Sequence, residues 1–198
     1  FLQHSMKWDK HFSSGIFSFH TNGLTIRAEG DYNDFDRENL AQKCPNKLAV
    51  ADVYFTDGIH YWGIKLDDTY SGCISIGVLD NDDLNKEDPN VRGIYPYNSI
   101  TDGPFHAHVG SGSVIGLLLD MDSKPTPLLY TFCDGYFIEK YTFKLTTGMT
   151  ARPAIKCAYL GETLSLIPDP PESSKVIKMY QEHDLRNIFE SDPEVMLL

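Results

Sequence analysis

Residues 60–67 have the sequence HYWGIKLD and follow the turn-forming pair Asp57-Gly58. Successive side chains of an extended chain point to opposite faces, so Trp62, Ile64 and Leu66 share one face. Three large apolar side chains at this spacing predict a β-strand with one side in a hydrophobic core.

Similar segments recur at regular spacing along the chain. They are Ile16–Ala28, Leu48–Phe55, Cys73–Leu79, Ser113–Met121, Leu128–Cys133, Tyr136–Phe143, Ala154–Tyr159 and Glu162–Ile167. Asn22-Gly23 and Asp134-Gly135 interrupt apolar runs, and such pairs are strong hairpin signals because both residues tolerate positive φ. Ser113–Met121 is nearly all apolar and is expected to lie inside a sheet. Without a βαβ unit or an internal repeat, the pattern predicts an all-β, two-sheet antiparallel β-sandwich.

Two long connections interrupt the strands. Gly30–Asn46 is polar and acidic, whereas Asp80–Pro104 is rich in Asp, Asn, Gly and Pro but carries Ile94, Tyr95 and Tyr97. Loops of this length are uncommon in a compact domain and are often functional.

The C-terminal part has a different pattern. Pro168-Asp169-Pro170-Pro171 ends the strands, and Ser173 or Ser174 can cap a helix that runs to about Glu190. A partial apolar stripe at helical spacing contains Ile177, Tyr180, Asp184 or Leu185, and Ile188. Two interpretations fit a short C-terminal helix with this stripe: it packs back on the sandwich, or it binds a partner.

Composition limits the partners and the organisation. The 198 residues contain 17 Lys and Arg against 28 Asp and Glu, so the formal charge is −11. Such a surface repels phosphate, which disfavours nucleic acid and anionic membranes as partners. The chain lacks an initiator Met and a secretory signal, so we expect a piece of a longer protein. The expected division is an N-terminal lead-in (1–14), the sandwich (15–168) and a Pro-rich linker with a helical tail (169–198).

The cysteines indicate a reducing compartment. Cys44, Cys73, Cys133 and Cys157 are widely spaced, without a CxxC pair or metal-finger spacing. Three of them lie in apolar, strand-like runs, where a free thiol behaves as a small buried hydrophobe. We therefore expect reduced thiols and a cytoplasmic location.

Five stretches resemble, in order, the motifs G-x-HYWEV, W-x-x-GV, V-G-x-x-LDY, LSFYxNG and xPxF of the SPRY domain family. They are residues 57–64 (DGIHYWGI), 75–78 (SIGV), 114–120 (VIGLLLD), 129–135 (LYTFCDG) and 152–154 (RPA). Ile16–Arg27 is similar to the end of the preceding PRY segment, although the upstream LDPxTA motif is absent. Gly63 replaces the usual Glu of HYWEV, and the Trp of W-x-x-GV is missing.

The resemblance implies a bent β-sandwich that is a non-catalytic protein-interaction module. Such modules occur at the C-terminus of many tripartite-motif ubiquitin ligases, and partners dock on variable loops at one side. Residues 93–98 (GIYPYN) correspond to a position where ligand-contacting aromatics often lie, and Tyr159 lies near another.

The residues in these loops suit recognition. Tyr95 and Tyr97 are two apart, so an extended loop points both rings the same way, and Pro96 stiffens the backbone between them. Tyr70 lies in a short polar loop, and it and Tyr159 are further candidates for partner contact. The alternative for all these rings is packing against the sandwich.

Acidic residues near these loops suggest the chemistry of the partner. Asp67 and Asp68 would favour a basic or amide-rich peptide by charge complementarity, unless they are only solvated loop charges.

Catalytic and metal-binding motifs fail their context tests. No G-x-S-x-G elbow occurs, and a strand pattern rather than a helix follows the glycine-rich residues 110–113. His106 and His108 share a strand face, but exposure on an edge strand explains them without a metal. Residues 80–85 begin like a calcium loop, yet Leu84 occupies a ligand position. We expect no catalytic residues, metal or cofactor.

The sequence therefore favours a module that binds a partner protein through rim loops, as the substrate-recognition part of a larger ubiquitin-ligase-type protein. The alternative is a carbohydrate-binding, lectin-like sandwich, because lectins share this form and stack sugars on aromatic rings.

Overall fold

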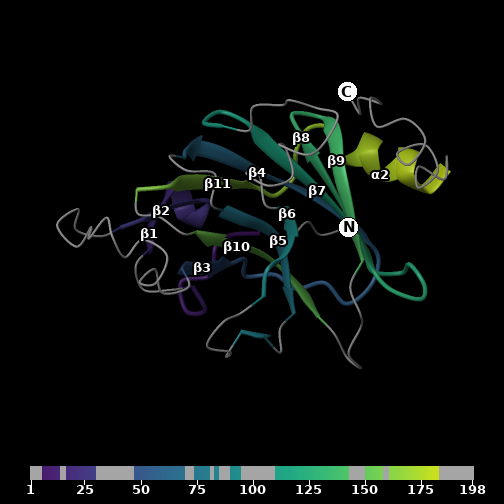
Figure 1. Ribbon diagram of the computed structural model, residues 1–198, viewed down its shortest axis with the longest axis horizontal. Coiled ribbons are helices and arrows are strands. Elements are labelled where there is room, and N and C mark those ends of the chain that lie inside the picture. The colour runs from purple at the N-terminus through teal and green to yellow at the C-terminus, as the bar shows by residue number, and fades with distance from the viewer. Residues whose placement is uncertain are drawn as a thin grey trace, which may run out of the picture.

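Two antiparallel sheets pack face to face, and one short helix lies outside the larger sheet (Figure 1). This architecture comes from a computed structural model. It describes residues 6–13, 17–29, 47–69, 74–80, 83–84, 90–94, 110–142, 150–157 and 161–182. The predicted all-β sandwich with a C-terminal helix is confirmed.

The larger sheet has seven strands in the order β1-β2-β11-β4-β7-β8-β9. Their bounds are β1 Phe17–His20, β2 Thr25–Ala28, β4 Ile59–Asp68, β7 Val114–Asp120, β8 Leu128–Cys133, β9 Tyr136–Thr142 and β11 Thr163–Ile167. The strand β7 lies between β4 and β8, as its apolar sequence predicts.

The smaller sheet has four strands in the order β3-β10-β5-β6. Their bounds are β3 Lys47–Val50, β5 Ile74–Asp80, β6 Arg92–Ile94 and β10 Ala151–Cys157. Two expectations need correction. The strand predicted for Leu48–Phe55 ends at Val50, and the connection Asp80–Pro104 contains β6, which pairs with β5.

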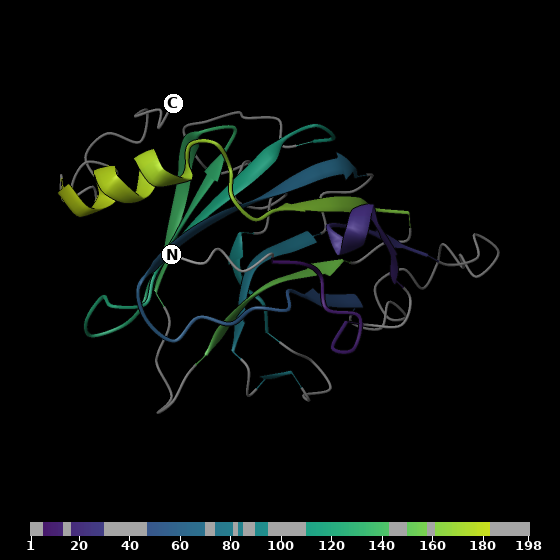
Figure 2. The same cartoon turned by 180° about the vertical axis from the view of Figure 1, so that it is seen from behind.

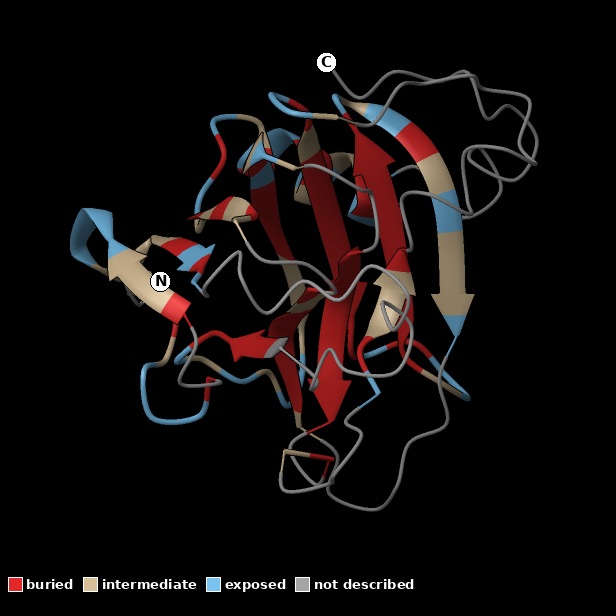
Figure 3. Ribbon diagram, turned by 60° about the vertical axis from the view of Figure 1, so that its left-hand side comes forward, coloured by how far each residue is buried: buried red, intermediate tan, exposed pale blue. Residues whose placement is uncertain are grey.

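The main core lies between the sheets. Trp62, Ile64 and Leu66 of β4 all point into it, as their spacing predicts, and Ile76 and Val78 of β5 face them from the smaller sheet. Figure 3 shows the central strands as buried along most of their length. Trp62 is completely buried, so this one ring anchors the centre of the core.

Residues of the expected N-terminal lead-in belong to the same core. Met6 and Trp8 are buried among the core residues. Trp8 forms an antiparallel β-bridge with Ala51, and its amide donates a hydrogen bond to the Gly23 carbonyl at 2.9 Å. The stretch around Trp8 therefore packs as part of the sandwich.

The two predicted hairpins are present. The turn between β8 and β9 has positive φ at both central residues, 49° at Asp134 and 84° at Gly135. The turn between β1 and β2 is a short 3₁₀ segment, η1 (Thr21–Gly23), with φ of 57° at Asn22 and 86° at Gly23. Both residues of each pair thus adopt the conformation that the sequence signal requires.

The outer face of the larger sheet is also apolar, and the helix α2 (Ser173–Glu182) covers it (Figure 2). Val176 and Tyr180 pack in one cluster with Tyr61 of β4, Leu118 of β7 and Phe132 of β8. The helix therefore packs back on the sandwich, which settles the two interpretations of its apolar stripe. It begins at Ser173 as predicted, and residues 183–190 of the expected helix lie outside the described residues.

A buried carboxylate anchors this helix. Tyr180 donates its hydroxyl hydrogen bond to Asp120 Oδ2 at 2.6 Å, while the amides of Asp122 and Ser123 donate to Asp120 Oδ1. Nearby, the Tyr61 hydroxyl donates to Glu172 at 3.3 Å. Burial, together with the negative charge of Glu172, raises the pKa of Tyr61 above its ordinary value, so this phenol stays protonated.

One departure from the SPRY motifs, Gly63, is buried in β4. A Cβ at Gly63 would lie 3.4 Å from Ile167 and 3.5 Å from Pro170, in the segment that leads into α2. These are ordinary van der Waals distances, so a Cβ fits at this position, but its neighbours are apolar side chains.

The described cysteines are buried thiols without a disulfide. Cys133 and Cys157 have no disulfide, and both lie in the core, as predicted. Cys44 and Cys73 lie outside the described residues. Burial, and then the negative charge of Asp134, raise the pKa of Cys133 to about 12.

Cys133 should consequently resist alkylation. A rise of its pKa from 9.0 to about 12 reduces the thiolate fraction at pH 8 about a thousand-fold. Because the thiolate is the reactive form, the alkylation rate should increase with pH up to about 12. Mass spectrometry of the Cys133 peptide after iodoacetamide treatment measures this rate, with the urea-unfolded chain as the control. Native and unfolded rates within ten-fold of each other would contradict the expectation.

Replacing Tyr180 by Phe should loosen the helix. The change removes a hydrogen bond to a buried carboxylate, and it should lower the free energy of unfolding by about 1.5–3 kcal/mol. Urea unfolding measures the loss. Tyr54→Phe is the matched control, because Tyr54 is 60% exposed and should change stability by less than about 0.5 kcal/mol. Equal stability of the two variants would show that the bond to Asp120 does not hold the helix.

Candidate interaction site

Three strand ends that border the predicted contact residues meet at one rim of the sandwich. Cys157, at the end of β10, pairs with Ile74 at the start of β5, and Ile94, at the end of β6, pairs with Ile76. In the larger sheet, Asp68 at the end of β4 pairs with Thr163, and residues 158–162 join Thr163 to Cys157.

The four predicted tyrosines come shortly after these strand ends in the chain. Tyr70, Tyr95, Tyr97 and Tyr159 lie outside the described residues, so their contact with a partner stays a prediction. What the described structure establishes is that β4, β6 and β10 all end at the same rim.

Asp67 and Asp68 lie in the last two positions of β4 at this rim. Asp67 is partly buried and already held: Lys65 Nζ lies 3.3 Å from its Oδ1, and the Ser165 hydroxyl donates to its Oδ2. Asp68 is exposed. A partner would therefore meet Asp68 first and would compete with Lys65 for Asp67, and both roles stay predictions.

Two glycines place the strand β6 at this rim. A Cβ at Gly77 would overlap the carbonyl oxygen of Arg92, and a Cβ at Gly93 would overlap that of Ile76. Gly77 and Gly93 pair directly, so the two backbones approach closely only because neither residue has a side chain. This contact fixes Ile94, the residue before Tyr95.

A second surface, which the sequence did not indicate, lies around Arg152 on the outer face of the smaller sheet. Arg152 pairs with Leu79, which belongs to a buried apolar cluster on that face with Val50 and Ala154. Its guanidinium carbon lies 4.9 Å from the ring centre of Phe12 and 6.0 Å from that of Tyr54. Phe12 and Tyr54 are 51% and 60% exposed, whereas Arg152 is 6% exposed.

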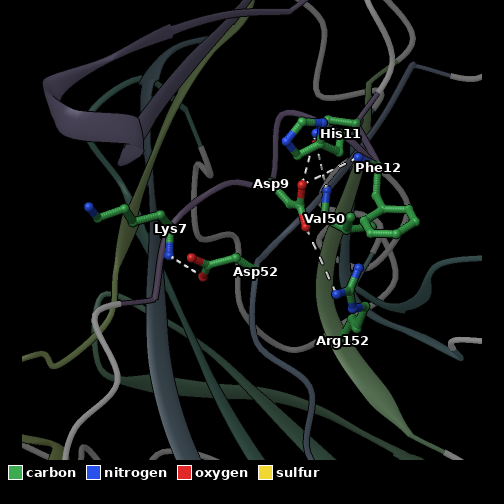
Figure 4. A network of polar contacts seen from close by, with 8 residues as sticks. Lys7, Asp9, His11, Phe12, Val50, Asp52 and Arg152 are labelled. Carbon is green, nitrogen blue, oxygen red and sulfur yellow. Dashed lines mark hydrogen bonds and ion pairs between the residues drawn. The ribbon is translucent and has the colours of Figure 1, made fainter.

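The Asp9 turn positions Phe12 over Arg152 (Figure 4). Asp9 Oδ1 accepts hydrogen bonds from the amides of His11 at 2.8 Å and Phe12 at 3.4 Å. The Val50 amide donates to Ser13 Oγ at 3.2 Å, and the Asp9 amide donates to the Val50 carbonyl at 2.8 Å. These bonds fasten residues 9–13 to the edge strand β3.

An open pocket of about 510 Å³ adjoins the same turn. Its lining includes Lys7, Lys10, His11, Phe19, His20 and Asp52. The Lys7 amide donates to Asp52 Oδ1 at 2.8 Å, and Lys10 Nζ lies 5.5 Å from the ring centre of Phe19. Basic and aromatic side chains, together with Asp9 and Asp52, therefore line the pocket beside the turn that carries Phe12.

No group of three or more His, Cys, Asp or Glu that could hold a metal ion occurs among the residues that the structure describes. His106 and His108 lie outside that part. Within it, no helix has the length and apolar character needed to cross a bilayer. The glycine-rich residues 110–113 form a turn, in which the Ser113 amide donates to the Gly110 carbonyl at 3.0 Å.

Comparison with known proteins identifies the fold. No protein-family model matches the chain. The SPRY domain of human HERC1 superposes with a TM-score of 0.52 over 81% of this chain and 96% of that domain, at 13% sequence identity. The PSpry domain of TRIM65 gives a TM-score of 0.49 over 82% of this chain and 92% of that one, at 14% identity. The chain thus has the fold of a SPRY domain, as its motifs predict.

A sequence match covers about half of the chain. The chain is 27% identical over 122 residues, 55% of its length, to the E3 ubiquitin-protein ligase TRIM9 of Drosophila melanogaster. It spans 15% of the length of that relative.

Adding a methyl group at Gly93 should displace β6. Gly93→Ala forces the β5 and β6 backbones apart, and overpacking of this kind costs about 1–3 kcal/mol of stability. Urea unfolding and hydrogen exchange of the β6 amides measure the effect. Gly110→Ala is the matched control, because nothing lies within 4 Å of a Cβ there. Equal stability and equal protection of the β6 amides in both variants would show that the contact between Gly77 and Gly93 does not determine the position of β6.

Proposed function

We propose that this chain is a non-catalytic protein-interaction module that binds a partner protein or peptide through the loops at the rim. One observation carries the proposal. The ends of β4, β6 and β10 meet at one rim, and in the sequence each of these strands is followed by a predicted contact tyrosine. Tyrosine is a frequent interface hot spot because its ring buries a large area and its hydroxyl still forms a hydrogen bond.

The chain is proposed to be the substrate-recognition part of a larger ubiquitin-ligase-type protein. The match to TRIM9 supports this role. The acidic pair Asp67 and Asp68 at the rim supports a basic or amide-rich partner. The buried free thiols of Cys133 and Cys157 support a cytoplasmic setting, and the net charge of −11 disfavours nucleic acid or membrane as the partner.

Affinity capture from cell lysate tests the binding site. The double variant Tyr95→Ala/Tyr97→Ala should lose the partner, because two hot-spot rings are worth about 2–4 kcal/mol, which is on the order of thirty-fold or more in affinity. Tyr136→Ala is the control, since Tyr136 is an exposed tyrosine on β9. Thermal melting confirms that all three proteins fold alike.

The other outcomes of this experiment are informative. Equal capture by both variants would move the binding site off this loop. Retention on immobilised sugars, with no captured protein, would favour the carbohydrate-binding alternative. For the ligase role, the chain fused to a RING domain should ubiquitinate the captured protein in vitro, and the double variant should not.

A further inference from the structure

The guanidinium of Arg152 is buried without hydrogen-bond acceptors for most of its donors. Its Nε and Nη1 are inaccessible to solvent and have no hydrogen-bond partner in the part of the chain that the structure describes. Nη2 lies 4.0 Å from Asp9 Oδ2, which is beyond hydrogen-bond distance. Leaving buried donors unsatisfied is costly, so a group that accepts hydrogen bonds from this guanidinium has a strong reason to bind.

The two aromatic residues that lie over Arg152 are exposed. Phe12, Tyr54 and Tyr136 are the exposed large hydrophobic residues among those described, and two of these three contact Arg152. Each ring faces the guanidinium on one side and solvent on the other. Either can turn aside without leaving a cavity in the core, which would open a path to Nε or Nη1.

Basic side chains lie at and next to the turn that carries Phe12. Among the described residues, Lys7 Nζ and Lys10 Nζ form no ion pair. The nearby carboxylates keep their charge and accept hydrogen bonds from backbone amides: Asp52 from Lys7, and Asp9 from His11 and Phe12. Charges beyond roughly 8 Å are largely screened at physiological salt, so the net negative charge of the chain does not by itself exclude an anionic group at this surface, where Lys7, Lys10 and Arg152 accompany Asp9 and Asp52.

We propose that Phe12, Tyr54, Arg152 and Lys10, the Arg152 patch, bind the side chain of a Glu in an acidic segment of a partner protein. The carboxylate accepts hydrogen bonds from the guanidinium, and the two rings pack on the neighbouring apolar residues of the segment. Glu suits the site better than Asp because its longer side chain reaches past the rings to the buried Nε and Nη1 of Arg152.

The Arg152 patch is distinct from the rim. Arg152 lies near the start of β10, whereas the rim lies at Cys157, where β10 ends. The inference therefore goes beyond the proposed function: the two ends of this strand take partner groups of opposite charge.

A titration with synthetic peptides, followed by NMR, tests the proposal. One short peptide of Gly, Ala and Leu has a central Glu, a second has Gln at the same place, and both are capped so that Glu carries the only charge. The Glu peptide should shift the Arg152 Nε–H resonance, which Arg152→Lys identifies by its disappearance. The Gln peptide should bind at least about ten-fold more weakly.

Surface variants keep the test independent of folding. Phe12→Ala and Lys10→Glu change exposed groups, and each should weaken binding of the Glu peptide several-fold. Tyr95→Ala/Tyr97→Ala should leave it unchanged, which separates this surface from the proposed rim site. Equal binding of both peptides, or no shift at Arg152, would overturn the proposal even if the rim captures its partner.

Discussion

The larger sheet is apolar on both faces, and the rest of the structure depends on covering both. Trp62 points from β4 into the space between the sheets, while Tyr61, its neighbour in sequence, points to the outside. A strand buried on both sides cannot form the surface of a two-layer sandwich. The smaller sheet covers one face and the helix α2 covers the other, so the fold has three layers at its centre.

The helix and the surfaces proposed for recognition lie on different parts of the sandwich. The helix contacts the larger sheet through a buried cluster and the bond between Tyr180 and Asp120. The smaller sheet is left with its outer face toward the N-terminal segment, and there the Asp9 turn holds Phe12 over a buried cation. The surfaces proposed for recognition thus lie at the rim and on the smaller sheet, away from the layer that the helix occupies.

The sequence predicted features that depend on local periodicity or local turns. The inward face of β4, the two hairpins and the start of the helix each follow from residues within a few positions of one another. The SPRY motifs also predicted the overall fold, because their order along the chain is a pattern that extends over most of the sequence.

Features that depend on contacts between distant residues were missed. The strand β6 forms because Gly77 and Gly93 approach closely, and nothing in the polar stretch between them shows this. The Arg152 patch joins residues from the N-terminal segment, the connection after β3 and the strand β10, so no window of sequence contains it. Of the six predicted contact residues, only Asp67 and Asp68 are described, and Asp67 already has partners within the chain.

The position of Gly63 links two distant parts of the chain. A Cβ built there lies 3.4–3.5 Å from the apolar side chains of Ile167, Val114 and Pro170, the last of which belongs to the segment that leads into α2. A charged group is costly to bury among apolar side chains. A small or apolar residue therefore suits this position as long as the segment 168–182 lies over β4, so that sequence changes in the two parts of the chain constrain each other.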